Sequence, residues 1–298
     1  MSSTPNPNAL VVKYRHLFPE LIKHSRAETI ITEENVYQPA NMEIRKIMES
    51  MCVDNLLPNS EFRGRDHIAD FLAKVKEGKR GIILMEHFSN FDLPGFIYLL
   101  ERSCPEGKEL ADRVVAIAGM KLSEDNKYVS AFAEAYSRVI IYPSRSLAAI
   151  KDPEQFEKEE KRSRVINLAS MRALDRVRKE GKVALVFPAG TRYRPGKPET
   201  RKGVREIDSY IRLSDVMLLV SINGNCLRFS EDPTDMLGDV VYQDRVIMTA
   251  SPAMDCKEFR AKALEGGSAD AEDKKQIVVD TVMDKLLAMH EENEKGRL

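Results

Sequence analysis

The sequence predicts an α/β protein with a mostly parallel central sheet flanked by helices and a small all-helical N-terminal domain. Before about residue 80, apolar residues recur only at helical spacing. From Gly81 onwards, short apolar runs alternate with helical stretches, a pattern typical of parallel strands covered by helices. The chain of 298 residues is long enough to bury such a core. The two parts are predicted as domains over residues 1–78 and 79–298.

The predicted N-terminal domain consists of helices only. Apolar residues recur at helical intervals in three stretches, over residues 10–22, 42–51 and 68–75. Gly78 follows the third stretch and suits the C-terminal end of a helix, because glycine readily adopts the left-handed conformation found there.

Five apolar runs are expected to form the buried strands of the sheet. Each run is rich in Val, Ile, Leu or Met without a polar alternation, as is usual for strands covered on both faces. The runs are residues 81–85, 114–118, 139–142, 183–187 and 217–222. One or two further strands are expected within residues 240–250, and an amphipathic helix from about residue 274.

The clearest helix is predicted between Asp152 and Gly181. Asp152 and Pro153 can supply its N-cap and first helical position, and Gly181 can end it. Its expected buried stripe is Val165, Leu168, Met171, Leu174 and Val177.

Composition narrows the function classes. A net charge of -1 and a pI near 6.6 exclude a strongly basic surface field, so no nucleic-acid partner is expected. The four cysteines form no CxxC pair, which argues against a zinc site or a disulfide framework and for a reducing compartment. Neither a signal peptide nor an apolar run of membrane-spanning length is evident. The expected location is therefore cytoplasmic or stroma-like, with peripheral membrane contact left open.

A first candidate site is the HxxxxD segment from His87 to Asp92, directly after the apolar run 81–85. Open α/β sheets place reactive groups at such strand ends. A histidine there can take a proton from a hydroxyl, and a carboxylate can fix its tautomer. Taken alone, the pair favours a structural interpretation, in which His87 lies at the edge of the core and Asp92 caps the next helix.

A second candidate site begins at Phe187 and reads FPAGTRYRPGK. Pro188 and Gly190 impose a turn at a strand end, and Arg192 and Arg194 can point to one side of it. Paired arginine donors suit phosphate oxygens, although an ordinary basic loop is the alternative. Because GxSxG, GxGxxG and HExxH motifs are missing from the sequence, hydrolase, dinucleotide and zinc-protease functions lack their residues.

These two segments, about a hundred residues apart, resemble the glycerolipid acyltransferase family, whose markers are HxxxxD and an FPEGTR-like sequence. Ala189 replaces the usual glutamate of the second marker. The soluble plastid-type glycerol-3-phosphate 1-acyltransferases also lack that glutamate and carry an arginine-X-arginine-proline sequence, as residues 192–195 do here. Residues 117–122 (IAGMKL) and 141–146 (IYPSRS) add to the similarity with this branch.

The resemblance implies transfer of a fatty acyl group from acyl-ACP or acyl-CoA to the sn-1 hydroxyl of glycerol-3-phosphate, in phospholipid biosynthesis, without a metal or other cofactor. His87 would be the general base and Asp92 would orient it. The residues implied to bind the phosphate, or to shape the loop that binds it, are Arg145, Arg192, Arg194 and Gly190.

Three points stay open in the sequence. The acceptor could be 1-acyl-glycerol-3-phosphate, and the chain could be a non-catalytic module that binds phosphate or lipid. Apolar residues within 91–100 could line an acyl pocket, although core packing explains them more simply. The basic residues Arg201, Lys202 and Arg205 could receive an acidic acyl carrier protein, the phosphates of coenzyme A or a lipid surface, or could form a solvated loop.

Overall fold

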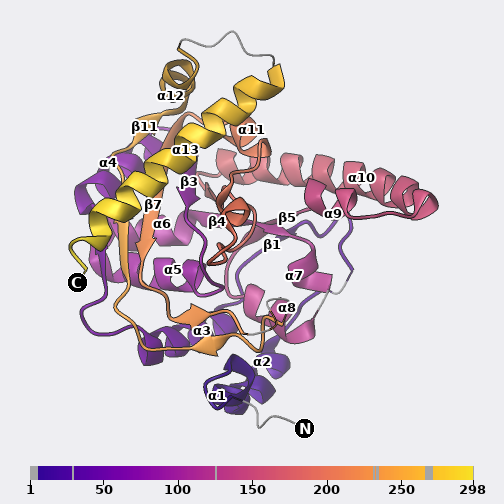
Figure 1. The fold of residues 1–298 in the computed structure, drawn as a ribbon, viewed down its shortest axis with the longest axis vertical. Helices are drawn as coiled ribbons and strands as arrows, with labels where there is room; N and C mark the ends of the chain where they lie inside the picture. The colour runs from indigo at the N-terminus through magenta and orange to yellow at the C-terminus, as the bar shows by residue number, and fades with distance from the viewer. Residues whose placement is uncertain are drawn as a thin grey trace.

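A mixed sheet runs through the centre of the molecule, with helices on both faces (Figure 1). The computed structural model describes residues 6–28, 30–124, 126–230, 232, 235–265 and 271–297. In sheet order, the strands of its main path are β1 (Tyr37–Gln38), β5 (Arg138–Ile141), β4 (Val114–Gly119), β6 (Val183–Val186), β3 (Gly81–Met85), β7 (Val216–Asn223), β10 (Ile247–Ala250) and β2 (Glu61–Arg63). β11 (Met254–Asp255) also pairs with β7, and β8 (Leu227–Arg228) and β9 (Val240–Val241) form a separate pair.

The four pairings at the centre of the sheet, from β5 through β4, β6 and β3 to β7, are parallel. β10 pairs antiparallel with β7, and β1 pairs antiparallel with β5. The predicted α/β class with a mostly parallel sheet is thereby confirmed, and each of the five expected buried runs forms a strand to within one residue at either end.

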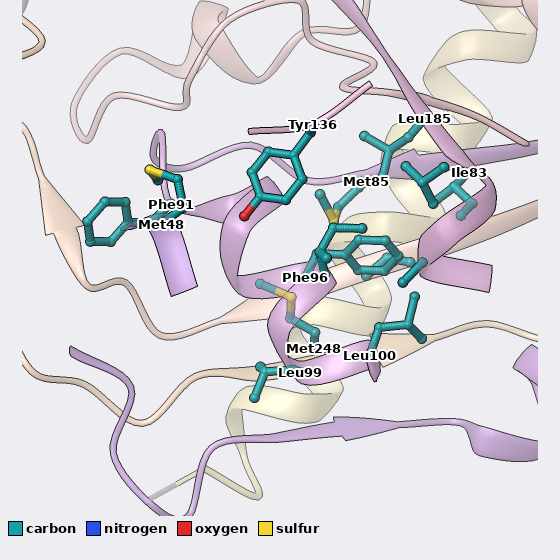
Figure 2. Close-up of a cluster of buried hydrophobic side chains, with 14 of the residues drawn as sticks. Met48, Ile83, Met85, Phe91, Phe96, Leu99, Leu100, Tyr136, Leu185 and Met248 are labelled. Carbon is teal, nitrogen blue, oxygen red and sulfur yellow. The ribbon is translucent and has the colours of Figure 1, made fainter. Parts of the chain in front are cut away.

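Side chains of the central strands β3, β6 and β7 alternate between two hydrophobic clusters, one on each face of the sheet. On β3, Ile83 and Met85 enter the first cluster, whereas Ile82 and Leu84 enter the second. Figure 2 shows part of the first cluster, including Met85 and Phe96. The helices that contribute to the first cluster include α3 (Met42–Asn55), α4 (Arg65–Lys76), α5 (Asp92–Ser103), α6 (Pro105–Arg113) and α8 (Lys127–Ala133). The second cluster includes residues of α10 (Pro153–Lys179), α11 (Glu206–Arg212), α12 (Cys256–Ala263) and α13 (Ala271–Glu294).

Shorter helices lie near the N-terminus and at strand ends. They are α1 (Leu10–Lys13), α2 (Phe18–His24), α7 (Lys121–Glu124) and α9 (Ser144–Ala148), together with the 3-10 helices Arg15–Leu17 and Pro198–Arg201. In Figure 1, α1 and α2 lie at the end of the molecule opposite α12.

Two strands within residues 1–78 correct the expectation that this part contains helices only. β1 pairs with β5 and β2 pairs with β10, so the two strands form opposite ends of the main path of the sheet. They are two and three residues long, too short to give a recognisable alternation of apolar side chains. The boundary between residues 78 and 79 stays a prediction, and strands from both sides of it share the same sheet.

The buried stripe of α10 differs from the one expected. Asp152 is the N-cap, as predicted, and its side chain accepts a hydrogen bond from the backbone of Gln155. Leu174 and Val177 are buried, but the first three residues of the expected stripe, Val165, Leu168 and Met171, are 48%, 54% and 53% exposed. The expected residues are spaced by three throughout. Because an α-helix has 3.6 residues per turn, residues at this spacing rotate steadily around the helix and do not stay on one face. The observed stripe alternates steps of three and four through Ser163, Ile166, Ser170, Ala173 and Val177.

The C-terminal helix α13 confirms the prediction of an amphipathic helix in this region. Val278 and Val282 are fully buried and Leu286 nearly so, and the helix crosses the sheet diagonally beside α11 (Figure 1). Among the described residues, no helix is long and apolar enough to cross a membrane.

Candidate active site

The HxxxxD segment forms a closed turn between β3 and α5. His87 Nδ1 lies 2.9 Å from Asp92 Oδ2. The same carboxylate oxygen accepts the backbone N–H groups of Phe88 at 2.6 Å and Ser89 at 2.9 Å, and Ser89 Oγ donates to Asp92 Oδ1 at 2.9 Å. Phe91, rather than Asp92, is the N-cap of α5. The capping alternative therefore does not explain the position of Asp92, whose side chain turns back toward His87.

The partners of Asp92 indicate which ring nitrogen of His87 carries the proton. A carboxylate that accepts two backbone N–H groups acts as an acceptor, so Nδ1 of the neighbouring imidazole donates to it. Nε2 then keeps its lone pair, as in a general base. The ring of His87 stacks on Phe187, with centroids 3.8 Å apart and planes at 14°, which restricts its rotation.

The two sequence motifs meet at the same edge of the sheet. β3 and β6 are adjacent and parallel, so the segments that follow them leave the sheet side by side. The backbone N–H of Tyr193 donates to the carbonyl oxygen of His87 at 2.7 Å, and the rings of Tyr193 and Phe88 make an edge contact. The FPAGTR loop therefore packs directly on the turn that holds His87.

Gly190 has φ +62°, in the left-handed region that side chains disfavour, and its N–H donates to the carbonyl oxygen of Phe187 at 2.9 Å. The turn expected from Pro188 and Gly190 is therefore present. The carbonyl of Pro188 accepts the N–H of Val204 at 2.9 Å, which ties the turn to the chain that leads into α11.

A cavity of about 840 Å³ has His87 and Gly190 in its lining, and it extends along the sheet as far as Arg80, just before β3. Most of its lining is apolar and comes from the ends of β4, β5 and β6 and from helices on both faces. At the start of α5, Phe91, Leu93 and Pro94 line it, whereas Phe96, Leu99 and Leu100 further along belong to the core (Figure 2). Only the first part of the 91–100 region therefore faces the cavity.

The three arginines expected at the site occupy different environments. Arg145 is exposed on α9 and lines the cavity with His87. Arg192 and Arg194 lie outside the described lining. Their guanidinium carbons lie 4.3 and 5.5 Å from the centre of the Phe229 ring, so the two side chains do share one side of the loop. Arg192 Nη1 also forms an ion pair with Asp239.

No pattern in the sequence pointed to Asp239 or Phe229 as residues near the site. Asp239 is completely buried, and burial raises the pKa of its carboxyl although Arg192 lowers it. Both residues lie more than 30 positions beyond the FPAGTR segment, in a stretch without a recognisable motif. A contact between such distant residues leaves no periodic or short-range signal in a single sequence.

A second buried pair lies next to His87. Glu86 Oε2 accepts the backbone N–H of Ile222 at 2.9 Å and lies 3.0 Å from His290 Nδ1, on α13. The hydrogen bond that Glu86 accepts from His290 raises the pKa of His290. In the described part of the chain, no three His, Cys, Asp or Glu side chains are grouped so that they could hold a metal ion.

Comparison with known proteins assigns this chain to a family. A family model described as Acyltransferase matches residues 60–219, which is just over half of the chain and includes both motifs. A search of the curated proteins finds no match. On the strength of the family model, the chain belongs to the acyltransferase family.

Proposed function

We propose that the protein transfers a fatty acyl group from a thioester to the sn-1 hydroxyl of glycerol-3-phosphate. Membership of the acyltransferase family supports acyl transfer in general. The observation that carries the finer proposal is the pairing of His87 with Asp92 at a largely apolar cavity that also contains Arg145. Such a cavity offers a base for a hydroxyl, a cation for a phosphate and apolar surface for an acyl chain.

The proposed reaction proceeds by direct attack. Nε2 of His87 takes the proton of the acceptor hydroxyl, and the hydroxyl oxygen attacks the thioester carbonyl carbon. Asp92 stabilises the imidazolium that forms through the hydrogen bond at Nδ1. The tetrahedral intermediate then expels the thiolate, which receives the proton from His87, so that the products are an ester and a free thiol. No covalent acyl-enzyme and no cofactor is required; acyl-ACP or acyl-CoA serves as co-substrate.

Arg145 is the proposed phosphate ligand, because its guanidinium can donate two hydrogen bonds to phosphate oxygens at the edge of the cavity. Arg194 is a second proposed ligand. The guanidinium groups of Arg192 and Arg194 both lie near the Phe229 ring, and the buried Nε of Arg194 has no hydrogen-bond partner among the described residues. Arg192 was expected to act with them but is engaged by Asp239.

The acyl donor is proposed to dock beside the FPAGTR loop. Arg201 lies over the ring of Tyr193, with its guanidinium carbon 4.6 Å from the ring centre, and the side chain of Lys202 is exposed next to it. Positive charge at this place suits an acidic acyl carrier protein or the phosphates of coenzyme A. We propose a cytoplasmic or stroma-like location with peripheral docking on an anionic membrane surface, and no nucleic-acid partner.

The test is thiol release by the purified protein, measured with palmitoyl-CoA and palmitoyl acyl carrier protein as donors and with glycerol-3-phosphate and 1-acyl-glycerol-3-phosphate as acceptors. We expect release that depends on glycerol-3-phosphate. Release that requires 1-acyl-glycerol-3-phosphate instead would replace the proposed acceptor. Binding of glycerol-3-phosphate without thiol release from either donor would favour a non-catalytic module.

A further inference from the structure

The ion pair between Arg192 and Asp239 is enclosed by protein. Arg192 is 8% exposed and Asp239 is 0% exposed. The guanidinium carbon of Arg192 lies 4.3 Å from the centre of the Phe229 ring, so the cation is held between a carboxylate and an aromatic ring. Removing one partner of a buried pair leaves an uncompensated charge, whereas removing both together does not. The link between the FPAGTR loop, which carries Arg192, and the segment that carries Asp239 is therefore stabilising only while both charges are present.

The segment that carries Asp239 is joined to the N-terminus as well. We call residues 235–241 the wall segment. The backbone N–H of Leu10 donates to the carbonyl oxygen of Asp239 at 2.9 Å, and that of Val11 donates to Leu237 at 3.0 Å. In Figure 1 the short orange strands lie close to α1. Asp239 thus connects the FPAGTR loop through its side chain with α1 through its backbone.

The wall segment and α1 contribute apolar surface to the active-site cavity. Met236 and Leu237 of the wall segment line the cavity, as does Leu10 of α1. Met48 and Phe91 also line it, from α3 and from the turn before α5. None of these five side chains can bind a phosphate or a hydroxyl, so this part of the cavity suits the hydrocarbon chain of a ligand.

We infer that the Arg192–Asp239 pair positions the wall segment against the acyl chain of the thioester donor. Asp239 is then a positioning residue. Arg192 holds the FPAGTR loop to the wall segment and does not bind the phosphate. This inference rests on the proposed function, since it requires an acyl donor. It explains why Arg192 is buried and faces Asp239 and Phe229, while Arg145 lines the cavity.

The first experiment uses Asp239→Leu, which leaves Arg192 without its partner. KM for donor and acceptor and kcat are measured with butyryl and palmitoyl thioesters. Because each buried methylene is worth about fourfold in binding, a displaced wall costs a long chain more than a short one. We expect KM for the palmitoyl donor to rise about tenfold, with little change for the butyryl donor or for glycerol-3-phosphate. If Asp239→Leu does not fold, Asp239→Asn is used in its place, because asparagine is nearly equal in size to aspartate and carries no charge.

The second experiment removes both charges at once, with Arg192→Met and Asp239→Leu in one protein. No buried charge is left unpaired, so the wall segment should stay in place and the KM for glycerol-3-phosphate should stay within about twofold of the unmodified protein. Asp284→Leu, an exposed position on α13, serves as the matched control for loss of an acidic side chain.

Two results would overturn the inference. A KM for glycerol-3-phosphate that rises tenfold or more in the paired variant would make Arg192 a phosphate ligand. An unchanged ratio of palmitoyl to butyryl KM in the Asp239 variants would show that the pair does not act on the acyl chain. Hydrogen exchange over residues 235–241 supplies a readout without turnover: exchange should quicken in Asp239→Leu and return toward normal in the paired variant. If the unmodified protein shows no thiol release, the proposed function fails. Unchanged hydrogen exchange in Asp239→Leu would instead show that the Arg192–Asp239 pair does not hold the wall segment in place.

Discussion

Individual side chains at the HxxxxD turn are held by more contacts than their proposed chemistry alone requires. Asp92 accepts from His87, from two backbone N–H groups and from Ser89, so its carboxylate cannot rotate away from the imidazole. The stacking of His87 on Phe187 fixes the other side of the ring. The orientation of the proposed base is thus set before substrate binds, which avoids an ordering cost during the reaction.

Changes at this turn should separate catalysis from folding. His87→Ala removes the proposed base, and Asp92→Asn presents an amide that can donate to Nδ1 and so favours the wrong tautomer. We expect kcat to fall by about a thousandfold in each, with KM for glycerol-3-phosphate nearly unchanged. Steady-state kinetics with thermal melting of the same samples checks this. Near-normal turnover in His87→Ala would exclude His87 as the general base.

Gly190 offers a second test of local geometry. Alanine at φ +62° is strained by about 1 kcal/mol, even though its Cβ would lie 3.6 Å from Val204 with room to spare. We expect Gly190→Ala to shift the turn and lower both stability and kcat. Gly196→Ala is the matched control, because Gly196 has φ +78° and no atom of the described residues lies within 4 Å of the position its Cβ would take. Gly196→Ala should lose a similar amount of stability but keep its kcat. An equal loss of kcat in both variants would mean that Gly190 has no specific effect on the turn beside His87.

Among the secondary-structure elements, α13 reaches the HxxxxD turn from the C-terminal part of the chain. His290 contacts Glu86 at the end of β3, and its ring centre lies 5.4 Å from that of Phe88. The side chain of Asn223 donates to the carbonyl oxygen of His290 at 2.9 Å and to Glu294 at 2.7 Å, which binds α13 to the end of β7. The position of the proposed base therefore depends on a helix outside the family-matched span.

The pH dependence of this attachment follows from His290. The hydrogen bond with Glu86 raises the pKa of His290 above its usual value of 6.5. A raised histidine pKa contributes stability that is fully present below the unfolded-state value and is lost as pH rises through the folded-state value. We expect the free energy of unfolding to fall as pH rises above the ordinary histidine value of 6.5, and this fall to shrink in His290→Gln. Denaturant unfolding at several pH values measures it, and an unchanged slope in the variant would contradict the assignment.

Across the chain, the features predicted from sequence are those that leave a short-range pattern. The five buried strands are continuous apolar runs because both faces of the sheet are covered. His87 and the FPAGTR turn directly follow two of them, so their meeting at one sheet edge could be expected from parallel pairing. β1 and β2 carry too few residues for any pattern, and the Arg192–Asp239 contact joins positions 47 apart in sequence. Such contacts arise only when the chain is folded.

The stability of the sheet as a unit should show a separate dependence on acid. Arg80 and Asp215 immediately precede β3 and β7, two adjacent central strands, and they form two side-chain hydrogen bonds of 2.9 and 2.8 Å. Arg80 lowers the pKa of Asp215 to about 2. A lowered carboxyl pKa contributes stability that is present above the unfolded-state value of 3.8 and is lost as pH falls through the folded-state value.

Asp215→Asn should therefore be less stable than the unmodified protein at neutral pH. The difference should narrow as pH falls from about 4 toward 2, because both proteins then lack the charge. Urea unfolding at pH 7, 4 and 2.5 measures this, with Asp284→Asn on the exposed side of α13 as the control. Because both residues are partly exposed, salt should reduce the effect. A difference that stays constant down to pH 2.5 would mean that Asp215 stabilises the strand starts by packing or neutral hydrogen bonds, and not through its charge.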